Sequence, residues 1–136
     1  MIVVDASVWV SLAIPEDAVR TVSRARLAAS IAAGEAFAGP SIVLAEVAGA
    51  VARRSGEAGK ADIAVQSLGA TPRMTIHAVD EALAREAARL AADLGLRGAD
   101  AVYVATAVRL GCPLVTWDDE MIRKTRDTIA ARQPLV

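Results

Sequence analysis

The sequence predicts an α/β fold of three layers, α/β/α, in which helices cover both faces of a central parallel sheet of four to five strands. Short apolar segments rich in valine and isoleucine alternate along the chain with longer, alanine-rich segments of helical spacing. Hydrophobic residues make up 54% of the chain and aromatic residues 3%, so we expect a core of small aliphatic side chains. The length of 136 residues suits one domain, residues 1–136, with a single core.

The first elements are a strand and two helices. Ile2–Val4 is wholly apolar and β-branched, which is typical of a strand buried on both faces. Ser7–Ala13 predicts a short helix that ends before Pro15. Glu16–Ala33 predicts a longer helix, because acidic residues open it and Gly34 follows it.

The middle of the chain continues the alternation. Glu35–Ala38 can supply a short strand, and Ser41–Arg54 predicts a helix whose first serine is its cap. Lys60–Leu68 predicts another helix, bounded on its N-terminal side by glycines. Met74–Ile76 is a third strand candidate, and Val79–Leu94 predicts a helix that ends at a glycine.

The last third of the chain carries a further helix–strand–helix series. Ala99–Leu110 predicts a helix that Gly111 ends, and Pro113–Thr116 predicts a fourth strand. Asp119–Ala131 predicts a final helix, and Pro134–Val136 can form a terminal strand. Because short strands alternate with helices throughout, the sheet is expected to be parallel and covered on both sides.

Composition excludes several classes of protein. Cys112 is the single cysteine, so neither an intrachain disulfide nor a cysteine-based zinc site is possible. No apolar segment approaches the roughly 20 residues that a membrane span requires, and the N-terminus does not resemble a signal peptide. These features predict a cytoplasmic protein with no membrane contact. A net charge of −1 argues against binding long nucleic acid by bulk charge, although a nuclease remains possible.

Two acidic residues follow predicted strands. Asp5 comes directly after the first strand, and Asp118 lies two residues beyond Thr116, at the end of the fourth. Ligands of open parallel sheets bind at the carboxyl ends of the strands, so both side chains are candidates for one site. The alternative for each is an ordinary loop or helix-cap aspartate.

Two further acids lie on predicted helices. The helical neighbours of Glu46 are apolar or small, so its carboxylate must be paired, protonated or bound to a metal. A buried ion pair with Arg53 or Arg54 is the structural alternative. Asp100 lies in the first turn of its helix, where the helix dipole alone would also favour an acid.

Together these four carboxylates predict a site for a hard divalent cation. Mg²⁺ and Mn²⁺ prefer oxygen ligands, and a cluster without cysteine or several histidines suits them. Such an ion can activate water and stabilise charge on a phosphoryl group. His77 is the single histidine, and we interpret it as a surface or strand-end residue.

Four sequence motifs, in order, resemble those of PIN-domain ribonucleases, especially VapC-type toxins. They are residues 1–10 (MIVVDASVWV), 40–47 (PSIVLAEV), 96–101 with 105–107 (LRGADA and ATA), and 114–118 (LVTWD). The resemblance covers nearly the whole chain. It implies a Mg²⁺- or Mn²⁺-dependent endoribonuclease with a PIN-like sheet between helices.

The resemblance also implies roles for single residues. Asp5 and Asp100 would be the main metal ligands, and Glu46 would complete or orient the metal shell. Asp118 would bind a second ion or hold a metal-bound water, although Asp119 beside it could be the fourth acid instead. The hydroxyls that match the family's supporting ones belong to Ser7 and Thr116.

Partners follow from the resemblance alone. VapC-type toxins form homodimers and are inhibited by a VapB-type antitoxin, so we expect both, with RNA as the substrate. The basic residues that could contact RNA are Arg53, Arg54, Arg123, Lys124 and Arg126. A solvated helix face would explain these five equally well.

Other functions fit less well. A phosphoryl-transfer enzyme with Asp5 as nucleophile would usually have a second aspartate where Ser7 stands. A receiver-like signalling domain would need paired acids after the first strand and a late lysine, and neither pattern is present. A PIN-like module that binds RNA or protein without cleaving it is the non-enzymatic alternative.

Overall fold

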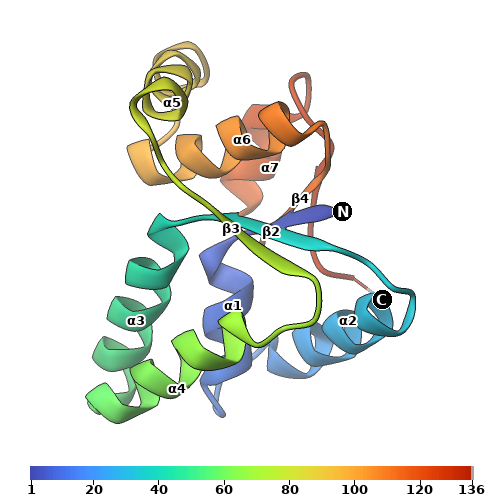
Figure 1. The fold of residues 1–136 in the computed structure, drawn as a ribbon, viewed down its shortest axis with the longest axis vertical. Helices are drawn as coiled ribbons and strands as arrows, with labels where there is room; N and C mark the ends of the chain where they lie inside the picture. The colour runs from blue at the N-terminus through green and yellow to red at the C-terminus, as the bar shows by residue number, and fades with distance from the viewer. Residues whose placement is uncertain (136) are drawn as a thin grey trace.

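A five-stranded parallel sheet forms the centre of the protein (Figure 1). The computed structural model describes residues 1–135. The strand order is β3-β2-β1-β4-β5, and each neighbouring pair is parallel. The strands are β1 (Ile2–Val4), β2 (Phe37–Pro40), β3 (Met74–His77), β4 (Leu114–Val115) and β5 (Ala131–Arg132). The predicted parallel α/β architecture is therefore confirmed.

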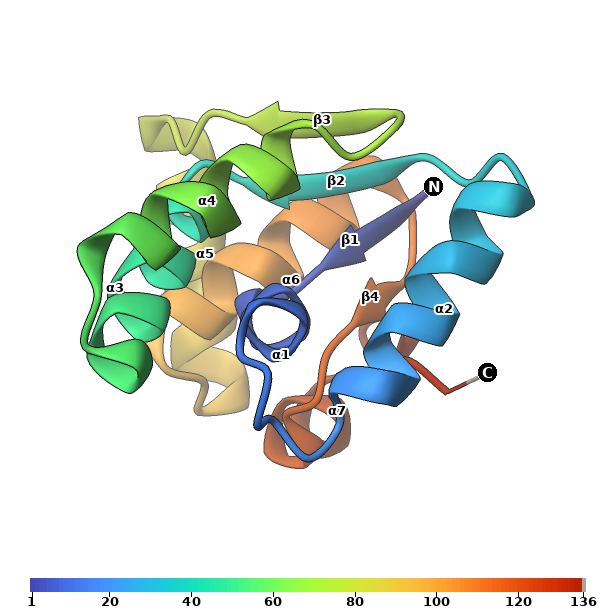
Figure 2. The same ribbon diagram turned by 90° about the horizontal axis from the view of Figure 1, so that it is seen from below.

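Helices cover both faces of this sheet, as Figure 1 shows with the sheet seen nearly edge-on. One layer contains α1 (Ala6–Ala13), α2 (Arg20–Ala32), α3 (Ile42–Ser55) and α4 (Ala58–Gly69). The opposite layer contains α5 (Glu81–Leu94), α6 (Gly98–Leu110) and α7 (Asp119–Thr125). Seen from below, α1 lies in the middle of its layer, where it contacts α2, α3 and α4 (Figure 2). None of the helices in residues 1–135 has the length and apolar character needed to cross a membrane.

The core lies between the sheet and the two helical layers and consists largely of small aliphatic side chains. Val43, Val47 and Val51 recur every four residues along α3 and are completely buried. This spacing places all three on the helix face that packs inward. From the opposite layer, Tyr103 and Val104 of α6 are equally inaccessible. Because aromatic residues are few, closely packed valine, alanine and leucine side chains fill most of the core.

The strand order creates a crevice beside β1. The chain leaves β1 toward β2 and β3 on one side of the sheet and returns to β4 on the other. Connections at the carboxyl ends of β1 and β4 therefore diverge, and this point in an open α/β sheet is where ligands bind. Here α1 follows β1, and α7 follows β4.

Two predicted helix boundaries are wrong. The second helix begins at Arg20 rather than Glu16, because the chain before it turns and the Asp17 side chain accepts a hydrogen bond from the N–H of Val19 at 3.1 Å. The last helix ends at Thr125 rather than Ala131. The segment that follows instead leads into β5, whose residues Ala131 and Arg132 pair with β4.

Strand positions differ in two places. The second strand spans Phe37–Pro40 rather than residues 35–38, because buried Phe37 pairs with both neighbouring strands. The last strand is Ala131–Arg132, and the N–H of Leu114 donates to the carbonyl of residue 130 at 3.0 Å. The strand expected at residues 134–136 is therefore wrong for 134 and 135, and Val136 lies outside the described residues.

Candidate active site

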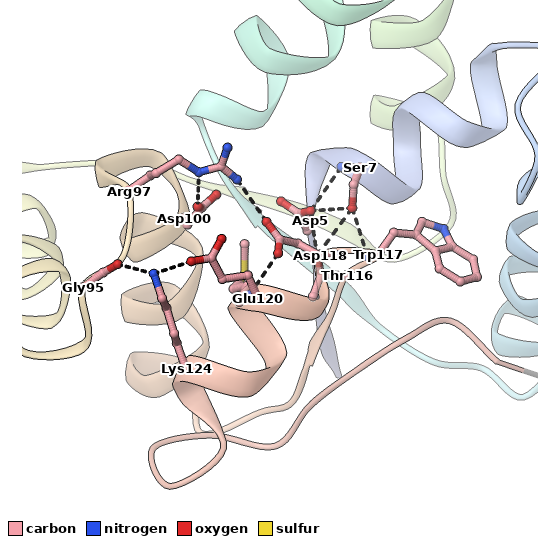
Figure 3. A network of polar contacts seen from close by, with 11 residues as sticks. Asp5, Ser7, Gly95, Arg97, Asp100, Thr116, Trp117, Asp118, Glu120 and Lys124 are labelled. Carbon is pink, nitrogen blue, oxygen red and sulfur yellow. Dashed lines mark hydrogen bonds and ion pairs between the residues drawn. The ribbon is translucent and has the colours of Figure 1, made fainter.

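Asp5 occupies the centre of the candidate site, directly after β1, and is only 7% exposed. Three donors meet its Oδ2 atom: the Ser7 N–H at 3.2 Å, the Ser7 hydroxyl at 2.5 Å and the Thr116 hydroxyl at 2.9 Å (Figure 3). The Ser7 N–H belongs to the first turn of α1, so Asp5 is also the cap of that helix. One side chain thus joins β1, α1 and the end of β4.

The other oxygen of the Asp5 carboxylate, Oδ1, accepts none of the hydrogen bonds formed within residues 1–135. Burial raises the pKa of this carboxyl, and the charge of Asp100 also raises it, while the bonds from Ser7 and Thr116 lower it. The net result is a raised pKa. An ionised Asp5 would therefore be stabilised by a positive charge, and Oδ1 is the atom open to bind it.

Glu46 contributes a second carboxylate from α3 and is half-buried. Its Oε2 atom accepts a hydrogen bond from the Tyr103 hydroxyl at 2.5 Å. Burial raises the pKa of Glu46, and so do the nearby charges of Asp5 and Asp100, against the lowering effect of the Tyr103 bond. Burial and the contact with Glu46 raise the pKa of Tyr103, which keeps this hydroxyl a donor.

Asp100 and Asp118 are connected by a shared arginine. Nε of Arg97 donates to Oδ2 of Asp100 at 2.7 Å, and its Nη2 donates to Oδ2 of Asp118 at 3.0 Å (Figure 3). Both carboxylates are largely shielded, with 16% and 25% of their side chains exposed. The remaining oxygen of Asp118 caps α7 by accepting the N–H of Met121 at 3.0 Å.

The neighbour of Asp118 points elsewhere. Oδ1 of Asp119 accepts a hydrogen bond from the Gln133 side chain at 2.7 Å, near β5 rather than at Arg97. The backbone around Asp118 is fixed by the site itself, because its N–H donates to the Thr116 hydroxyl at 3.0 Å. Geometry thus favours Asp118 as the fourth acid of the site.

The donor set suits a hard divalent cation. All four acids offer carboxylate oxygens, and Asp5, Glu46 and Asp100 each keep one oxygen that the hydrogen bonds described above do not use. Within residues 1–135, no three acidic, histidine or cysteine side chains are yet close enough to form a metal site.

A cleft of about 690 Å³ leads away from the acids. Ser7 and Glu46 line one part of it, and Arg53 and Arg54 line another. The ion pair considered for Glu46 is not formed, since Arg54 instead donates to Asp17 at 2.8 Å. No ion pair involves Arg53 among the described residues. Of the four acids only Glu46 lines this cleft, and the two arginines lie farther along the same helix, α3.

A second hollow, of about 670 Å³, lies among α1, α2 and α4. Its lining is mostly apolar and includes Trp9, Leu27 and Ile63, but none of the four acids. It is therefore not the candidate active site.

Two residues of the site were not predicted from the sequence. Arg97 was included only as part of the third motif, although a spacing of three residues from Asp100 at the start of a helix is usual for an ion pair. Tyr103 is the single tyrosine of the chain. A buried tyrosine hydroxyl normally has a hydrogen-bond partner, and this expectation could have pointed to a contact with a buried acid. His77 ends β3, as expected of a strand-end residue.

Comparison with known families identifies the fold. The family model described as PIN domain matches residues 2–127. The chain belongs to the PIN domain family. The resemblance of the four motifs to PIN domains is thereby confirmed. No curated protein is similar enough in sequence to be counted as a relative of this PIN domain.

Several solved structures have a similar fold. VapC20 of Mycobacterium tuberculosis, described as a sarcin-ricin loop cleaving toxin, is 18% identical over 98% of this PIN domain and all of that chain, with a TM-score of 0.77. VapBC2 of Rickettsia felis, bound to a promoter DNA fragment, is 16% identical over 98% of each chain, with a TM-score of 0.75. A toxin-antitoxin complex from Klebsiella pneumoniae is 17% identical over 98% of each chain, with a TM-score of 0.69.

The raised pKa of Asp5 predicts a stabilising substitution. A carboxyl whose pKa is raised by folding contributes stability below its unfolded pKa, and this contribution is lost as the pH rises through the folded value. Asp5→Asn removes the charge and keeps an oxygen that can accept from Ser7 and Thr116. In chelator, we expect this variant to melt a few degrees above the wild type at pH 8, and the difference to shrink toward about pH 4.

Thermal melts followed by circular dichroism across that pH range measure the effect. Asp93→Asn, an exposed acid on α5, is the matched control and should leave the melting temperature unchanged. A lower melting temperature for Asp5→Asn at pH 8 would show that the bonds from Ser7 and Thr116 to the carboxylate outweigh the cost of burying its charge.

Proposed function

We propose that this PIN domain is a metal-dependent endoribonuclease and the toxin of a toxin-antitoxin pair. The observation that carries the proposal is the buried Asp5 carboxylate, with one oxygen free, among three other carboxylates at the crevice beside β1. A parallel sheet with acids at this edge is a suitable scaffold for hydrolysis of phosphodiesters. The similarly folded VapC20 is described as a sarcin-ricin loop cleaving toxin, which supports a nucleic-acid loop as the class of substrate.

We assign roles to the four acids as follows. Asp5 and Asp100 would hold a Mg²⁺ or Mn²⁺ ion, and Glu46 would complete or orient its shell. Asp118 would bind a second ion or position a bound water. When bound, the ion would polarise the scissile phosphate and lower the pKa of an attacking water.

The surrounding groups would keep these acids in place. The Ser7 and Thr116 hydroxyls hold Oδ2 of Asp5, so Oδ1 would be available to the ion. Tyr103 holds Glu46 in the same way. Because these hydroxyls are donors to ionised carboxylates, they favour the charged forms that metal binding needs.

The cleft beside Glu46 is the proposed path of the RNA strand. Arg53 lines it and makes no ion pair among the described residues, so its guanidinium is available to a backbone phosphate. Of the other basic candidates, Arg54 and Lys124 are engaged with acids, the latter with Glu120 at 2.6 Å. An RNA substrate would also place the protein in the cytoplasm.

Metal-dependent cleavage is the first expectation. With Mg²⁺ or Mn²⁺, purified protein should cleave RNA and leave 5′-phosphate and 3′-hydroxyl ends, because water rather than the ribose 2′-hydroxyl attacks. Asp100→Asn should reduce cleavage by about a hundredfold or more, because loss of a ligand should cost at least as much as loss of a group that supports one, which is typically about ten- to a hundredfold. Asp119→Asn, which changes the neighbouring acid that bonds Gln133, is the matched control and should remain active.

Gel analysis of a mixed RNA pool measures the extent of cleavage, and end-group labelling identifies the ends of the products. Cleavage that continues in chelator, or products ending in a 2′,3′-cyclic phosphate, would contradict the proposed mechanism. RNA binding without cleavage in any metal would favour a binding module instead.

Arg53 should contribute to RNA affinity. In the inactive Asp100→Asn background, Arg53→Gln should weaken binding of a single-stranded RNA and reduce the slope of log affinity against log salt by about 0.7, the loss of one phosphate contact. Arg89→Gln on α5, also an exposed arginine, is the control. Fluorescence anisotropy at several salt concentrations gives the slope, and an unchanged slope would remove Arg53 from the RNA path.

A VapB-type antitoxin and a homodimer complete the proposal. The Klebsiella pneumoniae structure of similar fold is a toxin-antitoxin complex, which supports the antitoxin as partner. An inserted arginine or lysine of the antitoxin could satisfy the same carboxylates as the metal. For the dimer, light scattering should give about twice the 14.1 kDa mass of one chain at micromolar concentration, and a mass of one chain would contradict it.

A further inference from the structure

Arg97 differs from the other cations near the site because it bonds two of the proposed metal ligands at once. It stands immediately before α6, at the N-cap position, with 77% of its side chain exposed. One guanidinium reaches Asp100 on its own helix and Asp118 at the start of α7 (Figure 3). The two carboxylates come from segments far apart in the sequence, and Arg97 is the side chain that joins them.

We infer that Arg97 is an internal counter-ion, which neutralises Asp100 and Asp118 in the metal-free protein and competes with the divalent cation for them. The inference rests on the proposed metal site. Carboxylates gathered at one place repel each other unless a cation lies among them. Arg97 supplies such a positive charge, at 2.7 Å from Asp100 and 3.0 Å from Asp118.

The exposure of Arg97 makes it displaceable. Its ion pairs are at the surface, and pairs of this kind contribute little to stability because water competes for both partners. A doubly charged ion bound between shielded carboxylates interacts with them more strongly than an exposed guanidinium does. A cation at Asp100 would also repel the guanidinium bonded there, so metal binding and the Arg97 bridge oppose each other.

A purely positioning role for Arg97 predicts the opposite result. If the guanidinium only orients the two carboxylates for the ion, then its removal should loosen them and weaken metal binding. If it competes, its removal should strengthen metal binding. The sign of the change in metal affinity therefore distinguishes the two roles.

Calorimetric titration with Mn²⁺ alone, without RNA, tests the inference. Arg97→Gln should bind Mn²⁺ about threefold to tenfold more tightly than the wild type, the size expected from the loss of two exposed ion pairs. Arg97→Lys retains a charge but cannot bridge two acids in the same planar geometry, so its affinity should lie between the two. Arg109→Gln removes a similar bridge, between Asp80 and Glu86, and should leave the affinity unchanged.

Thermal melts provide a second readout. In chelator, Arg97→Gln should melt below the wild type, because the two acids lose their counter-ion, and saturating Mn²⁺ should close this gap. A merely structural role would lower the melting temperature equally in both conditions.

The results separate this inference from the proposed function. Weaker or unchanged Mn²⁺ binding by Arg97→Gln, with binding lost in Asp100→Asn, would overturn the counter-ion and leave the metal site intact. Absence of Mn²⁺ binding in the wild type and in Arg97→Gln would overturn both.

Discussion

The buried carboxylate of Asp5 is the constraint on which the rest of the site depends. An ionised group at the end of a central strand is stable only if donors or a cation replace the water it has lost. Ser7 and Thr116 supply those donors, and the same bonds start α1 and connect it to the end of β4. The Ser7 hydroxyl also accepts the N–H of Trp117 at 3.1 Å, which fixes the chain leading to Asp118. Satisfying one charge thus determines how three segments meet.

The strand order explains why acids from distant parts of the sequence gather there. Because β4 lies beside β1, the residues after both strands emerge at the same edge. Helices α3 and α6, from opposite layers, add Glu46 and Asp100, and the Tyr103 hydroxyl of α6 reaches across to Glu46. The site therefore depends on the complete three-layer arrangement. It could not form on one helix or hairpin, where residues close in sequence would have to provide every ligand.

The sequence predicted those features that are encoded locally. An acid directly after an apolar β-branched strand, or on an otherwise apolar helix face, contrasts with its neighbours, and so Asp5 and Glu46 could be identified. The bridge formed by Arg97 could not be identified from the sequence, because its second partner, Asp118, lies 21 residues away and contacts it only in the folded chain. The early end of α7 has the same cause: Ala131 pairs with Leu114, a contact that local helical propensity does not contain.

The four acids form a negative site that attracts a cation, whereas the surface that surrounds this site also carries positive side chains. The chain carries 16 acidic and 15 basic residues, so removing four acids into one site leaves the remaining surface with a small positive excess. Some basic side chains are paired with a nearby acid, as Arg54 is with Asp17. Arg53, in contrast, lines the cleft that leads to Glu46. A phosphate backbone would therefore meet a positive group before it meets the carboxylates, and it would approach them closely only when bound metal has offset much of their negative charge.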